Sequence, residues 1–110
     1  MQKMIDEHKS DQTIEYLDNR ISKFSMQNGK CAITGLYLTT ETMHCHHIIP
    51  KSLGGTDRFD NLMIVDIFVH KLIHATNPIT INKYLQLLKL KQKQLKKLNK
   101  LRSTCNLETI

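Results

Sequence analysis

Histidines are the residues of this sequence best suited to chemistry, and four of them form two close pairs. His46 and His47 are adjacent, whereas His70 and His74 are four positions apart. Positions i and i+4 lie on one face of a helix, so His70 and His74 can converge on one point. Neighbouring residues of an extended segment point to opposite sides, so one of the adjacent pair can join them while the other faces a substrate. This layout predicts a hydrolytic site with one metal ion.

Phosphodiester hydrolysis is a reaction that uses these residue types. It needs a nucleophile made from water, a cation that offsets the charge building on phosphorus, and help for the departing 3′-oxygen. Histidine titrates near neutrality and can accept the proton of the water. The residues alone leave open which of His46 and His47 is the ligand and which is the base. Imidazoles favour Zn²⁺ or Ni²⁺ and Mg²⁺ favours oxygen, so we expect Mg²⁺ or Mn²⁺ for turnover and Zn²⁺ or Ni²⁺ as possible occupants.

Short strands and a loop are expected around the first histidine pair. Residues 30–34 and 42–49 are β-prone and predict a β-hairpin or a loose ribbon. Residues 52–60 contain Gly54-Gly55 and predict a loop. Residues 61–65 are apolar and extended again.

A helix is expected before these strands, near residues 11–27. Asn28-Gly29 would stop it, and Ser10 or Asp11 would cap its start. Its apolar residues recur at helical spacing: Ile14, Leu17, Ile21 and Phe24.

Helices are also expected after the strands. Asp66 is a candidate cap for a helix over residues 67–75, which would carry His70 and His74. Pro78 suits the first turn of the next helix. Leucines at a spacing of three, beside many lysines, predict a further amphipathic helix over residues 91–103.

The charge of the chain favours a polyanionic partner. The 110 residues carry a net charge of +6, and a run near the end holds seven positive charges without an acid: Lys89, Lys91, Lys93, Lys96, Lys97, Lys100 and Arg102. Like charges four residues apart repel each other on a helix, and a phosphate backbone would relieve this repulsion. We expect nucleic-acid contacts from Lys93, Lys97 and Lys100, and from Lys51 and Arg58 beside the Gly-Gly loop.

Cysteine usage and hydropathy indicate the compartment. The odd cysteine count and the lack of a CxxC pair argue against a disulfide framework and for a reducing compartment. The polar start of the chain has no signal-peptide pattern. The longest apolar run, residues 61–73, contains charged residues and cannot span a bilayer. We therefore expect a cytoplasmic protein with no membrane partner, in which Cys31 and Cys45 are small core residues.

Together these motifs resemble the HNH endonuclease motif: His46-His47-Ile48-Ile49-Pro50, Gly54-Gly55, Asp60-Asn61-Leu62, His70 and His74. The resemblance implies an α+β chain with the small ββα-metal (HNH) fold, an N-terminal helix and C-terminal amphipathic helices. It implies that His46, His70 and His74 bind one divalent metal ion and that His47 is the base. It also implies that Asn61 either ties the loop to the hairpin or binds the metal directly.

A wider resemblance, over residues 18–103, is to the C-terminal endonuclease region of bacterial group II intron reverse transcriptases. It implies that the chain nicks DNA to leave a 5′-phosphate and a 3′-hydroxyl, with intron RNA and a reverse transcriptase domain absent from this chain as possible partners. Many HNH domains hold a structural zinc with two CxxC pairs, but Thr34 stands where the second cysteine of the first pair would be. Packing and the catalytic metal would therefore hold this core.

These observations define one expected organisation and three functional hypotheses. Residues 1–10 would be flexible, and residues 11–110 would form a single HNH endonuclease domain with a basic helical extension from about residue 78. The first hypothesis is a metal-dependent endonuclease. The alternatives are a non-catalytic, metal-stabilised nucleic-acid-binding module and a nuclease toxin.

Overall fold

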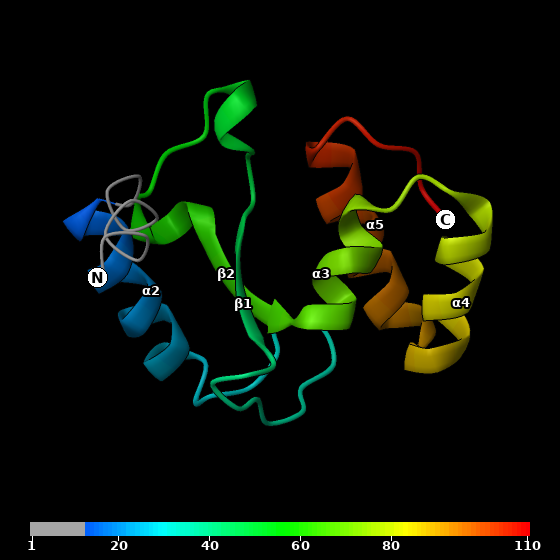
Figure 1. The fold of residues 1–110 in the computed structure, drawn as a ribbon, viewed down its shortest axis with the longest axis horizontal. Helices are drawn as coiled ribbons and strands as arrows, with labels where there is room; N and C mark the ends of the chain where they lie inside the picture. The colour runs from blue at the N-terminus through cyan, green and yellow to red at the C-terminus, as the bar shows by residue number, and fades with distance from the viewer. Residues whose placement is uncertain (1–12) are drawn as a thin grey trace, which may run out of the picture.

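Two antiparallel strands and the helix that follows them form the centre of the fold (Figure 1). The computed structural model describes residues 13–110, and the segment expected to be flexible, residues 1–10, lies outside them. The helices and strands are α2 (Ile14–Met26), β1 (Met43–His47), β2 (Leu62–Asp66), α3 (Ile67–His74), α4 (Pro78–Leu88) and α5 (Gln92–Thr104). The chain is therefore α+β, and the predicted ββα arrangement with flanking helices is confirmed.

The hairpin is built from different segments than the sequence suggested. β1 pairs with β2, with Met43 opposite Asp66 and His47 opposite Leu62. The β-prone residues 30–34 form a turn, which meets the rest of its segment through one isolated bridge, between Lys30 and Tyr37.

The Cys31 thiol explains this difference. Its sulfur accepts backbone N–H bonds from Ile33 and Thr34, both at 3.4 Å, and from Asp66 at 3.3 Å. A backbone whose donors turn back onto a side chain cannot continue as a strand. Cys31 is 2% exposed, as predicted for a core residue, whereas Cys45 is half-buried, and all three cysteines are free.

Helix α3 lies between the hairpin and the last two helices, so it links the strands to the core. Its N-cap is Asp66, whose carboxylate accepts the Phe68 N–H at 2.7 Å, as predicted. Buried apolar residues of β2, α3 and α5 form the main core with Cys31 and Ile33: Val65, Val69, Leu72, Ile73, Leu98 and Leu101. The histidine-bearing helix is thus fixed on its core side.

Arg102 belongs to the C-terminal run of positive charges but does not face solvent. It is 2% exposed, and its guanidinium donates to the carbonyls of Leu72, Ile73 and Ala75 at 2.8, 3.2 and 2.8 Å. The last carbonyls of a helix lack partners within the helix. Arg102 therefore caps α3 and is not available to a phosphate.

Helix α2 packs differently from the expected pattern. Its N-cap is Thr13, which accepts the Tyr16 N–H at 2.9 Å, so the helix begins at Ile14, slightly later than expected. Ser10 and Asp11, the expected caps, lie outside the described residues. Ile14 and Ile21, members of its apolar stripe, are 79% and 66% exposed. Lys23 is the buried residue of this helix, and its ammonium lies 3.8 Å from the ring centre of Phe59. No helix among residues 13–110 has both the length and the apolar character needed to cross a bilayer.

Candidate metal centre and catalytic histidine

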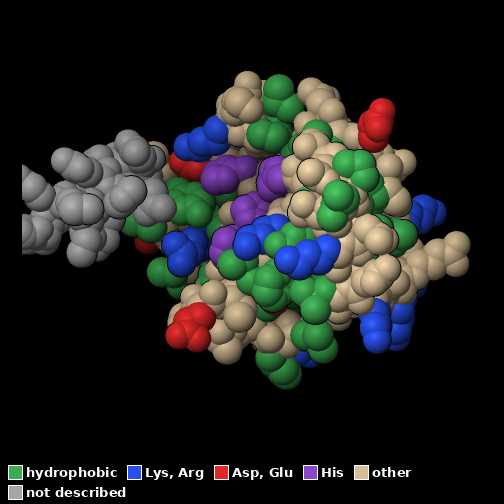
Figure 2. All heavy atoms as spheres, turned by 45° about the vertical axis from the view of Figure 1, so that its right-hand side comes forward, with side chains coloured by type: hydrophobic (Ala, Val, Ile, Leu, Met, Phe, Trp, Pro, Cys, Tyr) green, Lys and Arg blue, Asp and Glu red, His purple; other side chains and the backbone are tan. Residues whose placement is uncertain are grey.

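Three histidines from two elements meet at one point, at the end of β1 and along α3. His46, His70 and His74 each offer a ring nitrogen, and these atoms lie within 4.8 Å of one another. The ring centre of His46 lies 5.3 Å from that of His70 and 5.2 Å from that of His74. The three form part of the wall of a pocket of about 260 Å³, and Figure 2 shows histidines gathered on one face with lysine or arginine side chains beside them.

His46 is the residue of this cluster that most needs a further partner. Its side chain is 0% exposed, yet neither ring nitrogen has a hydrogen-bond partner among the described residues. A buried polar group without a partner costs roughly 1–3 kcal/mol. Burial, with the nearby His70 and His74, lowers the pKa of His46 to about 3. The ring is therefore neutral near pH 7, which is the form that binds metals.

The pKa values of His70 and His74 are also lowered, mainly by burial. Burial, with His74 and His44 nearby, lowers the pKa of His70 to about 4. Burial and Arg102 lower the pKa of His74. The Nδ1 atom of His70 lies 3.0 Å from Nδ1 of His44. The Nε2 atom of His70 is therefore the nitrogen available to a metal ion.

These residues fit a divalent metal ion. Metal–nitrogen bonds to histidine are about 2.0–2.1 Å long, so two nitrogens on one ion lie at most about 4 Å apart, closer than the 4.8 Å within which these three lie. Small rotations of the rings would bring the three nitrogens onto one ion. One of the two unpartnered nitrogens of His46 would then bind the ion.

His47 follows His46 on β1, where neighbouring side chains leave opposite faces of the strand, and it lines the same pocket. Its Nε2 lies 2.9 Å from Oδ1 of Asp57. Its ring stacks on that of Tyr16, with the centres 5.4 Å apart and the planes inclined by 9°. The ring is thus held from two sides, and Nδ1 makes no hydrogen bond within the described residues.

Asp57 is a site residue that the sequence analysis missed. It is 7% exposed, and its carboxylate accepts from His47, from Lys51 and from the hydroxyl of Thr13. Burial by itself would raise the pKa of Asp57, but these hydrogen bonds lower it to about 2. The available signal was an acid in the loop between the Gly-Gly pair and Asn61, ten residues after His47.

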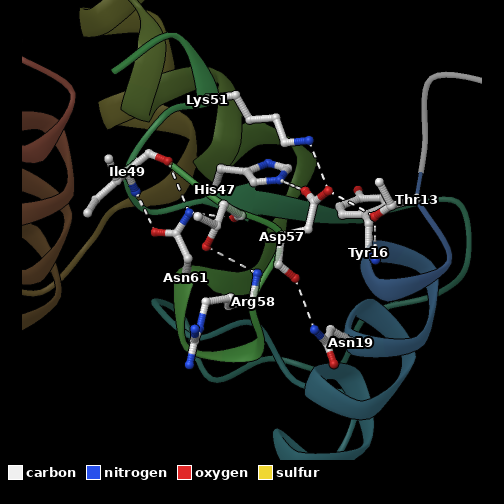
Figure 3. Close-up of polar contacts among 10 residues, drawn as sticks. Thr13, Tyr16, Asn19, His47, Ile49, Lys51, Asp57, Arg58 and Asn61 are labelled. Carbon is white, nitrogen blue, oxygen red and sulfur yellow. Dashed lines mark hydrogen bonds and ion pairs between the residues drawn. The ribbon is translucent and has the colours of Figure 1, made fainter. Parts of the chain in front are cut away.

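Asn61 uses its side chain to close the loop between the strands (Figure 3). Its Oδ1 accepts the Ile49 N–H at 2.9 Å, and its Nδ2 donates to the carbonyls of Ile49 and Thr56 at 3.1 and 2.8 Å. This is the loop-tying arrangement, and it leaves the amide oxygen already engaged. The loop requires glycine at position 55, because a Cβ there would collide with the Ile49 carbonyl oxygen.

The lysines and arginine expected at a nucleic-acid interface occupy two regions. Lys51 lines the histidine pocket and lies 2.9 Å from Asp57, and Arg58 is exposed beside it in the chain. Lys93, Lys97 and Lys100 are exposed on α5, which packs against α3 through the buried Leu98 and Leu101. Lys97 donates to the Ala32 carbonyl at 3.0 Å. Among the basic residues named here, Lys51 lines the histidine pocket and the α5 lysines do not.

Comparison with known proteins agrees with this geometry. No curated protein and no solved structure matches the chain. Residues 29–65 match the family model described as HNH endonuclease. The match includes His46, His47 and Asn61, and His70 and His74 follow it on α3. The matched stretch is therefore similar to HNH endonucleases, a class that acts on nucleic acid and generally uses a divalent metal.

Proposed function

We propose that this chain is a metal-dependent endonuclease that nicks DNA and leaves a 5′-phosphate and a 3′-hydroxyl. One observation carries the proposal: the nitrogens of His46, His70 and His74 converge within 4.8 Å, and His47 lines the same pocket. A purely structural metal site would have no use for this additional imidazole.

Each histidine has a role in the proposed reaction. His46, His70 and His74 would hold the divalent cation, which when bound stabilises charge on the phosphate and on the departing oxygen. His47 accepts a proton from water at Nδ1. The water oxygen then bonds to phosphorus, the bond from phosphorus to the 3′-oxygen breaks, and this oxygen takes a proton from solvent. Asn61 keeps the loop that carries Asp57 in register with His47.

The basic residues would contact the DNA in two places, one next to the scissile bond and one further along the backbone. Lys51 and Arg58 are placed to contact phosphates next to the scissile bond, and Lys93, Lys97 and Lys100 would contact the backbone further away. Removing one lysine that binds a phosphate should reduce the slope of log affinity against log salt by about one. Lys100→Gln should therefore flatten this slope without changing cleavage at saturating DNA.

The proposal extends to the biological setting. The sequence of residues 18–103 resembles the endonuclease region of group II intron reverse transcriptases, so we assign the nick to intron mobility, where its 3′-hydroxyl would prime reverse transcription. A reverse transcriptase should extend the product of cleavage directly. A 3′-phosphate end would block extension and contradict this assignment.

A nicking assay tests the function itself. Supercoiled plasmid incubated with the chain and Mg²⁺, Mn²⁺ or Zn²⁺ should convert to open circles, and DNA ligase should reseal them because the ends are 5′-phosphate and 3′-hydroxyl. A chelator should abolish the conversion. If DNA is bound but not cut with any of these ions, the chain is a metal-stabilised binding module.

A further inference from the structure

Asp57 is a buried acid whose carboxylate contacts three side chains. Its Oδ2 accepts from the Thr13 hydroxyl and the Lys51 ammonium, both at 2.9 Å, and its Oδ1 lies 2.9 Å from Nε2 of His47 (Figure 3). The backbone carbonyl of Asp57 accepts separately from Asn19 at 3.0 Å. The loop is therefore anchored to α2 without the contact between Asp57 and His47.

The contact with His47 determines where that ring carries its proton. An ionised carboxylate only accepts hydrogen bonds, so the nitrogen that faces it must carry hydrogen. A neutral imidazole has one such hydrogen, so a proton on Nε2 leaves the lone pair on Nδ1. The nitrogen that must take a proton from water in the proposed reaction is then the one with a free lone pair.

Tyr16 and Asp57 each constrain a different aspect of the orientation of the His47 ring. Tyr16 lies parallel to His47 and fixes the plane of the imidazole. A stacking contact does not distinguish the two flipped positions of the ring, whereas the Oδ1 atom of Asp57 does. After proton transfer, the same carboxylate would face an imidazolium that still donates from Nε2.

We propose that Asp57 is a positioning residue for His47, whose carboxylate holds the imidazole as the Nε2–H tautomer and directs Nδ1 towards the attacking water. This inference rests on the proposed function for the identity of the base. The tautomer itself can be measured without any cleavage.

Asp57→Asn is the informative substitution, because the surrounding donors fix how the new amide must lie. The Thr13 hydroxyl and the Lys51 ammonium both donate to the Oδ2 position, so the amide oxygen should stay there. The amide NH₂ then occupies the Oδ1 position and donates to Nε2 of His47. His47 would be forced to carry its proton on Nδ1, where it blocks acceptance from water.

Two measurements test this inference, the first of them on the Zn²⁺-loaded chain. In ¹⁵N-resolved NMR of the histidine rings, wild type should show His47 protonated on Nε2, and Asp57→Asn should show it protonated on Nδ1. With the ion that supports nicking, kcat should fall at least about 100-fold in Asp57→Asn, with KM for plasmid within about twofold. An Asp57→Asn variant that keeps the Nε2–H tautomer, or that cuts at the wild-type rate, overturns the inference.

Asn19→Ala is the matched control. It removes the hydrogen bond to the backbone carbonyl of Asp57 and leaves the carboxylate in place. The variant therefore shows what weaker anchoring of the loop does by itself. We expect its kcat to stay within about threefold of wild type and its His47 tautomer to be unchanged. Equal losses in Asn19→Ala and Asp57→Asn would mean that Asp57 only anchors the loop. If wild type does not cut, the proposed function fails, and the NMR result still decides the tautomer.

Discussion

His44 and His70 meet through their Nδ1 atoms at 3.0 Å, with their rings close to perpendicular. Only one of the two nitrogens in this contact carries the hydrogen. If His70 binds a metal through Nε2, its Nδ1 carries the proton and His44 accepts it. Partners of this kind orient metal-binding histidines and raise their basicity. His44 lies two positions before His46 on β1, so strand alternation places both on the side of α3.

His44→Phe should weaken metal binding although it removes no ligand. The ring can still pack against His70, but the acceptor for Nδ1–H is removed, and we expect a 10–100-fold rise in Kd for Zn²⁺. Competition with a chromogenic chelator measures this change. His44→Gln restores an acceptor oxygen and should recover part of the affinity. Equal affinity in wild type and His44→Phe would show that the contact does not support the metal centre.

His46→Leu should stabilise the metal-free protein while it abolishes metal binding. The imidazole is fully buried with both nitrogens unpartnered, and an apolar side chain of similar size removes a cost of roughly 1–3 kcal/mol. Urea unfolding in a chelator should show the gain in free energy of unfolding. His74→Leu is the control, since the His74 side chain is more exposed to solvent than that of His46 and should give a smaller gain. A loss of stability in His46→Leu would contradict the interpretation of His46 as a residue kept for a ligand.

The metal-free protein should lose stability as the pH falls from about 6.5 to about 4. In the folded state the pKa of His46 is about 3 and that of His70 about 4, whereas histidine in an unfolded chain has a pKa near 6.5. The unfolded chain therefore binds more protons than the folded chain across this range. The free energy of unfolding consequently decreases as the pH is lowered. Urea unfolding in chelator at several pH values measures the slope. His46→Leu should have a shallower slope than wild type.

Arg102→Met should destabilise the fold without reducing contact with DNA. It leaves the carbonyls of Leu72, Ile73 and Ala75 without their buried donor, which we expect to cost about 2–4 kcal/mol. Thermal unfolding measures this loss, and Lys100→Met, at an exposed position of the same helix, should change stability by less than about 0.5 kcal/mol. The salt dependence of DNA binding should be unchanged in Arg102→Met and reduced in Lys100→Met. The opposite pattern would mean that Arg102 contacts phosphate.

Local signals predicted most elements correctly because those signals are satisfied within a few residues. Asp66 caps α3 and Asn77 precedes Pro78 at the start of α4, as their side chains and φ preferences require. The spacing of His70 and His74 likewise placed both on one face of α3. Strand alternation and helix periodicity are both short-range, so they predicted that one of His46 and His47 joins His70 and His74, and the resemblance to the HNH motif chose His46.

Contacts between distant segments could not be predicted in the same way. Residues 30–34 have β propensity, but the Cys31 sulfur takes the N–H of Asp66, 35 residues away in sequence, and bends the segment into a turn. Asp57 looked like an ordinary loop acid because its partner Thr13 is 44 residues away. The burial of Arg102 could not be predicted from the run of positive charges because its carbonyl partners, Leu72, Ile73 and Ala75, belong to another segment.

The role of His47 as the base is best tested by cleavage of supercoiled plasmid, with wild type and His47→Ala compared at equal metal occupancy. We expect His47→Ala to bind the metal ion and to retard DNA as wild type does, yet to nick at least about 100-fold more slowly. Wild-type nicking rates in His47→Ala would contradict the claim that His47 is the base.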